Sequence, residues 1–217
     1  LSEQGSRDLG AILLRIIIPC VIIKSYITEY SHQRLLELGL SALLALISYV
    51  VAMLLSYLVF GQRRRLENFA AAFCNAGFIG IPLVQAVVGQ EGVFYIAAFV
   101  ALLNLFQWTY GVYIMTGRKD TISPKAIARN PVVISIVIGV ALFLSRVTLP
   151  GILTSTLGYV ADMNTPVAMI LMGTYLARLP LRRMLDRRAV GCVLMRLVVI
   201  PAAVGLVFWL MPVDNLP

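Results

Sequence analysis

The chain has 217 residues, of which 60% are hydrophobic and only 13% are charged, whereas soluble globular domains carry about a quarter charged residues. Together with a mean hydropathy of +0.90, this composition excludes an ordinary soluble domain and indicates an integral membrane protein. The formal net charge of +8 does not indicate nucleic-acid binding, because the basic residues lie in short loops between apolar segments.

Seven apolar segments follow one another along the chain, each close to the roughly 20 residues needed to cross about 30 Å of hydrocarbon. They are predicted at residues 9–27, 35–60, 67–88, 92–116, 131–147, 152–177 and 189–211. Arg15 and Lys24 interrupt the first segment, whereas Gly, Pro, Asn and Asp interrupt the third and the sixth. The expected fold class is therefore an all-α integral membrane protein.

The basic residues divide unequally between the two sets of loops that seven crossings create. Thirteen fall on one side, and the other side receives only Arg34 and Arg146, with Lys24 nearby. The thirteen are Arg7, Arg63, Arg64, Arg65, Arg118, Lys119, Lys125, Arg129, Arg178, Arg182, Arg183, Arg187 and Arg188. By the positive-inside rule, the Arg-rich loops are predicted to be cytoplasmic, so that the chain starts inside and ends outside.

Cysteine and histidine usage predicts neither a disulfide framework nor a metal site. Cys20, Cys74 and Cys192 lie within apolar segments without CxxC spacing, and His32 is the only histidine. No cofactor is expected.

Three predicted spans carry a proline well inside the hydrocarbon, namely Pro19, Pro82 and Pro166. Proline removes one backbone donor and clashes with the carbonyl one turn earlier, so each predicts a kink or a break. A lone proline is a weak signal, since membrane helices tolerate proline and glycine. The motifs NAGFIGIP (75–82) and DMNTP (162–166) are stronger, because helix breakers occur there beside hydrogen-bonding side chains.

The two motifs predict discontinuous helices near the bilayer midplane. Asn75 and Asn164 lie about eight and about twelve residues into their segments, which places both near the midplane at about 1.5 Å per residue. Pro82 and Pro166 can each begin a new half-helix, and Thr165 is a suitable N-cap. Such half-helix N-termini form the substrate sites of many secondary transporters.

The alternative interpretation of these motifs is tight helix packing. Small residues such as Gly77 and Gly80 let helices approach closely, and asparagine side chains can hydrogen-bond between helices. Asn104 and Gln107, within the fourth segment, either face the same cavity or join helices in this way.

Asp162 is the only acidic residue well inside a predicted span. An ionisable group at that depth is costly, so Asp162 is a candidate for proton coupling, cation pairing or substrate contact. The alternative is that it lies nearer the outer surface and caps the second half of its helix. Arg15 and Arg196 lie about seven residues in from the cytoplasmic end and are expected to snorkel toward it.

At these motifs the sequence resembles the auxin efflux carrier family. The resemblance is carried by NAGFIGIPLVQAVVGQEGVFYIAAFVALLNLFQWTYG, NPVVISIVIG, NTPVAMILMGTYLA and RLVVIPAAVG, which are similar to the family's fourth to eighth helices. It implies a fold of ten helices in two inverted five-helix repeats with broken crossover helices, of which about seven helices are present.

The resemblance also implies a division of the chain. Residues 1–117 would form the first repeat without its first helix, 118–130 the cytoplasmic connecting loop, and 131–217 the second repeat without its last two helices. The family's crossover site forms where the broken fourth and ninth helices meet, so half of it is expected here, with Asn75, Gly77, Gly80 and Pro82.

The sequence therefore predicts a secondary transporter of a small organic anion, auxin-like or a dicarboxylate, that works by alternating access. The substrate-contacting residues are expected to be Asn75, Gly77, Gly80, Pro82, Asn164, Thr165 and Pro166, with Asp162 as the proton-coupling residue. The expected surroundings are the lipid bilayer of a plasma membrane, most simply a bacterial inner membrane, and a homodimer is compatible with the sequence.

Other classes remain open at this stage. The first is a transport-inactive membrane receptor or scaffold that has inherited a carrier fold. An intramembrane enzyme is disfavoured, because no paired Ser/Lys, carboxylate or metal constellation is present in the sequence. A channel is disfavoured by the absence of a continuous ring of charge.

Overall fold

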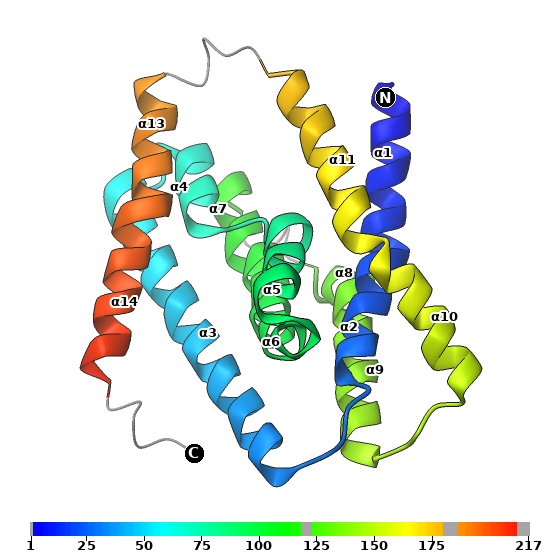
Figure 1. Ribbon diagram of the computed structural model, residues 1–217. Helices are drawn as coiled ribbons and strands as arrows, with labels where there is room; N and C mark the ends of the chain where they lie inside the picture. Colours follow the sequence, from blue (N-terminus) through cyan, green and yellow to red (C-terminus); the bar gives the residue numbers. More distant parts are fainter. Residues whose placement is uncertain (1, 119–122, 180–185, 212–217) are drawn as a thin grey trace.

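The computed structural model describes residues 2–118, 123–179 and 186–211, and every regular element within these ranges is a helix (Figure 1). The elements, with π-helical turns named η, are α1 (Glu3–Ile12), η1 (Leu13–Ile17), α2 (Ile18–Tyr26), α3 (His32–Phe60), α4 (Arg65–Ala72), η2 (Ala76–Gly80), α5 (Ile81–Val88), α6 (Gln90–Phe106), η3 (Gln107–Gly111), α7 (Val112–Thr116), α8 (Pro124–Ala128), α9 (Pro131–Ser145), α10 (Gly151–Asp162), α11 (Asn164–Ala177), α13 (Arg187–Leu194), η5 (Met195–Val199) and α14 (Ile200–Leu210).

Helices coincide with the seven predicted segments to within about three residues at their ends, except that the first helix begins six residues earlier than predicted. Within the part of the chain that the structure describes, four continuous stretches are long and apolar enough to cross a membrane: Glu3–Tyr26, His32–Phe60, Gln90–Thr116 and Arg187–Leu210. The fifth segment forms α9, which at 15 residues spans about 22 Å. The third and sixth segments form helices interrupted where NAGFIGIP and DMNTP predicted interruptions. The chain is a multi-pass membrane protein.

Serine side chains set where the first and second of these stretches begin. The Ser2 hydroxyl accepts a hydrogen bond from the Gly5 backbone N–H at 3.0 Å, so the first helix starts at Glu3 rather than near residue 9 as predicted. Ser31 caps α3 in the same way through the N–H of Arg34 at 3.1 Å. N-capping side chains of this kind satisfy helix donors that have no partner within the helix.

Prolines inside the helices are accommodated by π-helical turns. Pro19, Pro82 and Pro201 each follow such a turn by two residues, after η1, η2 and η5 respectively. The N–H of Ile18 bonds back five residues to the Leu13 carbonyl, and the N–H of Ile200 bonds likewise to Met195. The wider turn makes room for the carbonyl that the proline ring would otherwise strike, so these helices continue across the proline.

Two pairs of helices run antiparallel and pack side by side (Figure 1). The first pair joins the α1–η1–α2 helix to the α10–α11 helix, which touch along most of their length. The second pair joins α3 to the α13–η5–α14 helix. Close packing in the interior depends on small residues: a Cβ on Gly139 of α9 would lie 2.5 Å from the ring of Tyr26 in α2.

The outer surface of the helices is apolar. Large side chains that are more than half exposed occur on several of them, including Leu58 at 69%, Val87 at 76% and Trp209 at 80%. A surface of this kind is stable against lipid chains rather than water.

Candidate functional site

The third segment is interrupted by a stretch of non-helical backbone at Phe73–Asn75, between α4 and η2. The sequence placed the break within NAGFIGIP, but the chain is already helical from Ala76 onward. The backbone carbonyl of Asn75 accepts hydrogen bonds from Ile79 at 3.1 Å and from Gly80 at 3.4 Å, and so begins the new half-helix. The non-helical residues therefore end at Asn75, where the sequence predicted them to start.

Arg196 binds the end of α4, which precedes this break. Its Nη1 donates to the backbone carbonyls of Ala71 at 3.0 Å and Ala72 at 3.2 Å, the last two residues of α4. The final carbonyls of a helix have no partner within it, and a cation there also suits the helix dipole. The prediction that Arg196 snorkels to the cytoplasmic end is wrong, because these carbonyls offer it partners within the protein.

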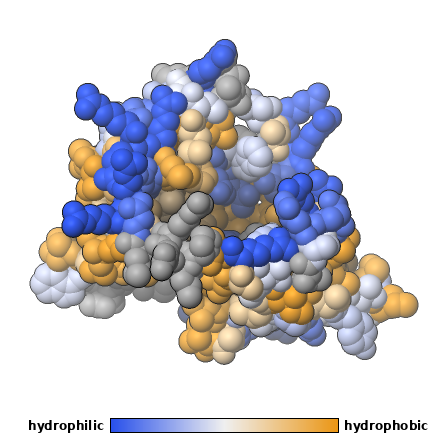
Figure 2. Space-filling view, turned by 90° about the horizontal axis from the view of Figure 1, so that it is seen from above, coloured by the Kyte–Doolittle hydropathy of each residue, from blue (hydrophilic) through white to orange (hydrophobic). Residues whose placement is uncertain are grey.

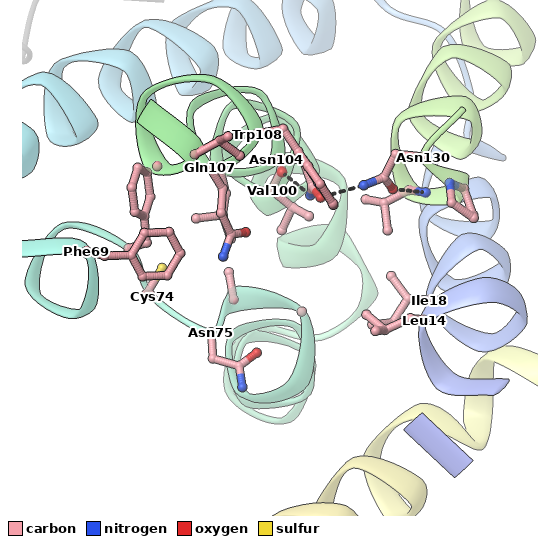
Figure 3. Close-up of a pocket in the computed structure, with 18 of the residues that line it drawn as sticks. Leu14, Ile18, Phe69, Cys74, Asn75, Val100, Asn104, Gln107, Trp108 and Asn130 are labelled. Atoms are coloured by element: carbon pink, nitrogen blue, oxygen red, sulfur yellow. Dashed lines mark hydrogen bonds between the residues drawn. The ribbon is translucent and has the colours of Figure 1, made fainter. Parts of the chain in front are cut away.

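An open cavity of about 860 Å³ lies beside the break. Its lining comes from the helices on both sides of the bundle and includes the non-helical residues themselves (Figure 3). The described residues that line it are Leu14, Arg15, Ile18, Phe69, Phe73, Cys74, Asn75, Ala76, Gly77, Val100, Leu103, Asn104, Gln107, Trp108, Gly111, Val112, Met115, Thr116, Asn130, Pro131 and Val132.

Amide side chains supply much of the cavity's polarity. Asn130 accepts from the N–H of Val132 at 2.9 Å to cap α9, and its amide group donates to Asn104 Oδ1 at 3.1 Å. Asn104 in turn donates to the Val100 carbonyl at 2.8 Å. Asn104 therefore does both things that the sequence allowed, joining α6 to α9 and facing the cavity, while Gln107 lines the cavity beside it.

Asn75 lies at the edge of the cavity with an exposed side chain. In Figure 3 its amide is turned away from the hydrogen-bonded pair Asn104 and Asn130, whereas the Gln107 amide points toward the break. The cavity therefore offers amide groups from α6, from the start of α9 and from the break itself.

Arg15 is the only charged side chain among the described residues that line the cavity. The sequence suggested that it snorkels to the cytoplasmic end, and its place in the lining shows a different environment. In the sequence, Arg15 is recognisable only as a cation within a span, four residues before Pro19. That position alone does not predict a neighbouring cavity.

Of the predicted crossover residues, only Asn75 and Gly77 line the cavity. A Cβ on Gly77 would lie 3.4 Å from Ile18 Cδ1, so this glycine allows η2 to lie close to α2. Gly80 packs beside Ala76 and Ile96, and Pro82 is buried as the second residue of α5. The packing interpretation therefore describes Gly80 and Pro82 well.

The sixth segment is interrupted more mildly than the sequence suggested. Only Met163 separates α10 from α11, and its N–H bonds to the Val160 carbonyl at 3.2 Å. Helix α11 begins at Asn164, and Thr165 is not its N-cap. Pro166 sits in the first turn, where its missing N–H costs no helical hydrogen bond, so no longer non-helical stretch is needed.

The structure brings the two interruptions together without placing both at the cavity. Helix α11 contacts η1, η2 and α5, but Asn164, Thr165 and Pro166 are outside the described cavity lining. The Asn164 side chain is fully buried, and neither its Oδ1 nor its Nδ2 has a hydrogen-bond partner among the described residues. Thr165 and Pro166 are exposed on the outer side of the helix.

Asp162 pairs with Lys24 rather than standing alone within a span. The Lys24 Nζ lies 3.1 Å from Asp162 Oδ1, and the Asp162 side chain is 64% exposed. This ion pair joins the end of α10 to α2. The sequence allowed Asp162 a cation partner but did not identify Lys24, because the two residues are 138 positions apart.

Comparison with known proteins assigns the chain to a family. Neither the curated proteins nor the solved structures contain a match to it. A family model described as membrane transport protein matches residues 1–214, and this is a family of transporters rather than of enzymes. The chain therefore belongs to the membrane transport protein family of the auxin efflux carriers, as its motifs predicted.

Proposed function

We propose that the protein is a secondary carrier of a small organic anion and that the cavity beside Phe73–Asn75 belongs to its substrate site. The observation that carries the proposal is the lining of this cavity. Non-helical backbone, amide side chains and one arginine meet there, and no carboxylate occurs among the described lining residues. Backbone of this kind at membrane depth is tolerated only where it is buried or lines a cavity.

The chemistry of the lining suits an anion with an apolar body. Amide N–H groups such as those of Gln107 and Asn75 can donate to a carboxylate, and Phe69, Phe73 and Trp108 offer apolar and aromatic surface. Sites for small molecules usually combine such an apolar lining with a few convergent polar groups.

Alternating access would follow from an inverted repeat, which we propose with residues 1–117 and 131–217 as its two halves, joined by 118–130. Two features support this division. The helix that contains Pro19 packs antiparallel to the helix that contains Pro166, and α3 packs antiparallel to the α13–η5–α14 helix (Figure 1). Each pair consists of helices that would correspond between the repeats.

The proposed orientation places the Arg-rich end in the cytoplasm of the cell, with the protein in a plasma membrane. Figure 2 shows this end, where hydrophilic side chains gather around the N-terminus and the start of α13. The described arginines there include Arg63 and Arg64 between α3 and α4, and Arg65 at the start of α4, in keeping with the positive-inside rule.

For energy coupling, we assign proton uptake to Asp162. Protonation of its carboxylate removes the charge that attracts Lys24, and so releases the contact that joins α10 to α2. The contact lies at the last residue of α10, next to the interruption of the sixth segment. The arrangement therefore links a proton to the relative position of two helices.

Uptake into liposomes that contain the full-length protein tests the proposal. Radiolabelled organic anions, both monocarboxylates and dicarboxylates, are offered outside, and protein-free liposomes serve as the control. The carrier assignment predicts saturable uptake of at least one anion. A receptor or scaffold that no longer binds an organic anion would show neither uptake nor an anion-dependent rise in unfolding temperature. Such a rise is expected whenever a ligand binds the folded state.

A further inference from the structure

Arg15 occupies an unusual position in the cavity. It belongs to η1, the π-helical turn that precedes Pro19, and it shares its face of the helix with Leu14 and Ile18, which also line the cavity. Leu13, Ile17 and Ile18 are buried in the hydrophobic core, whereas Leu14 and Arg15 are exposed. The helix is thereby fixed in rotation, and the arginine is kept on the cavity side.

The charge of Arg15 is not neutralised by the part of the chain that the structure describes. It makes no hydrogen bond or ion pair with any described residue, and most described acidic residues are engaged elsewhere. Their partners are Arg7 for Glu3, Gln4 for Asp8, Gln33 and Tyr95 for Glu37, Arg64 for Glu67, Arg34 for Glu91 and Lys24 for Asp162.

An unpaired cation beside apolar surface within a membrane protein is costly, and such residues mark substrate or ion pathways. A guanidinium group is also well matched to a carboxylate, because two of its N–H groups can bond both oxygens. We propose that Arg15 binds the negatively charged group of the substrate and so selects the cargo by its charge. This inference rests on the proposed carrier function and names the residue that determines its specificity.

The same lining predicts how many charges the cargo carries. One carboxylate balances Arg15, whereas a second would lie among amides, aromatic rings and aliphatic side chains without a cationic partner among the described lining residues. Burial of an uncompensated charge is strongly unfavourable. The site therefore prefers one negative charge to two on bodies of similar size.

Ligand binding to the full-length protein in detergent tests this assignment. Trp108 lines the cavity and serves as the fluorescent reporter, with the second tryptophan removed by Trp209→Phe. The probes are benzoate, its neutral analogue benzamide and its dianionic analogue terephthalate, with propionate and malonate as a second, smaller pair. Each probe is titrated into three proteins that all carry Trp209→Phe: one with Arg15 unchanged, one with Arg15→Gln and one with Arg15→Lys. The three proteins must have the same unfolding temperature.

The proposal predicts that monoanions bind more tightly than their neutral and dianionic analogues. Arg15→Gln should weaken monoanion binding about 10- to 100-fold, the value of a hydrogen bond to a charged group, and leave benzamide binding unchanged. Arg15→Lys should restore most of the preference.

If Arg15→Gln binds and transports the anions as the wild type does, Arg15 has no part in binding the substrate, and this inference fails while the carrier function stands. The inference also fails, again without loss of the carrier function, if dianions bind more tightly than monoanions. If the wild type neither binds nor transports any anion, the proposed function fails as well.

Discussion

Replacing Arg196 with leucine should destabilise the protein strongly, because it leaves the end of α4 without its hydrogen-bond donor. Arg196 Nη1 serves the carbonyls of Ala71 and Ala72 at 3.0 and 3.2 Å, and both alanines are fully buried. An unsatisfied buried acceptor costs about 1–3 kcal/mol, so two of them give about 2–5 kcal/mol after allowance for partial relaxation. The loss of a cation at the helix C-terminus adds to this cost.

The free energy of unfolding, measured by SDS titration in mixed micelles and followed by circular dichroism, checks this value. Arg187→Leu is the matched control, since Arg187 lies on the same helix, is exposed, and makes no hydrogen bond or ion pair with a described residue. Arg196→Lys should fall between the wild type and Arg196→Leu, because one ammonium serves two carbonyls less well than a guanidinium. The reasoning is refuted if Arg196→Leu is no less stable than Arg187→Leu.

Two further predictions concern packing and coupling. Gly139→Ala should cost about 1–3 kcal/mol of unfolding free energy through overpacking, because the new Cβ would lie 2.5 Å from the buried Tyr26 ring. Gly173→Ala, with nothing within 4 Å of its Cβ, should be neutral or stabilising in the same titration; equal losses would contradict the packing argument. Asp162→Asn should abolish the acceleration of anion uptake by a proton gradient, whereas Asp186→Asn should not. A gradient effect that persists in Asp162→Asn would remove this residue from the coupling mechanism.

The sequence predicted the positions of the helices well, because the length and apolarity of a membrane-crossing segment are local properties. It also located both interruptions, since NAGFIGIP and DMNTP contain helix breakers that act on their own neighbours. It was less accurate about the form of the interruptions. The residues before Asn75 lose their helical structure, and Pro82 is accommodated by the π-helical turn η2 instead of starting the half-helix.

The roles of the two intramembrane arginines could not be predicted, because they depend on distant contacts. Arg196 meets the Ala71 carbonyl across 125 positions in the chain, and Arg15 is distinguished by the lining of a cavity that several helices build. From the sequence alone, both arginines are cations near the ends of spans, and snorkelling was therefore predicted for both. For the same reason the sequence allowed Asp162 a cation partner without identifying Lys24 as that partner.

The central claim is that the break ending at Asn75 forms part of the substrate site. Anion uptake by liposomes containing wild-type protein, Asn75→Ala or Gln33→Ala tests it most directly, with the substituted amide of Gln33 lying on an exposed part of α3 as the control. The account predicts that Asn75→Ala slows uptake and weakens the apparent affinity about 10- to 100-fold, the value of one hydrogen bond to a charged group, while Gln33→Ala matches the wild type. If Asn75→Ala leaves both the rate and the apparent affinity unchanged, the break is not part of the substrate site.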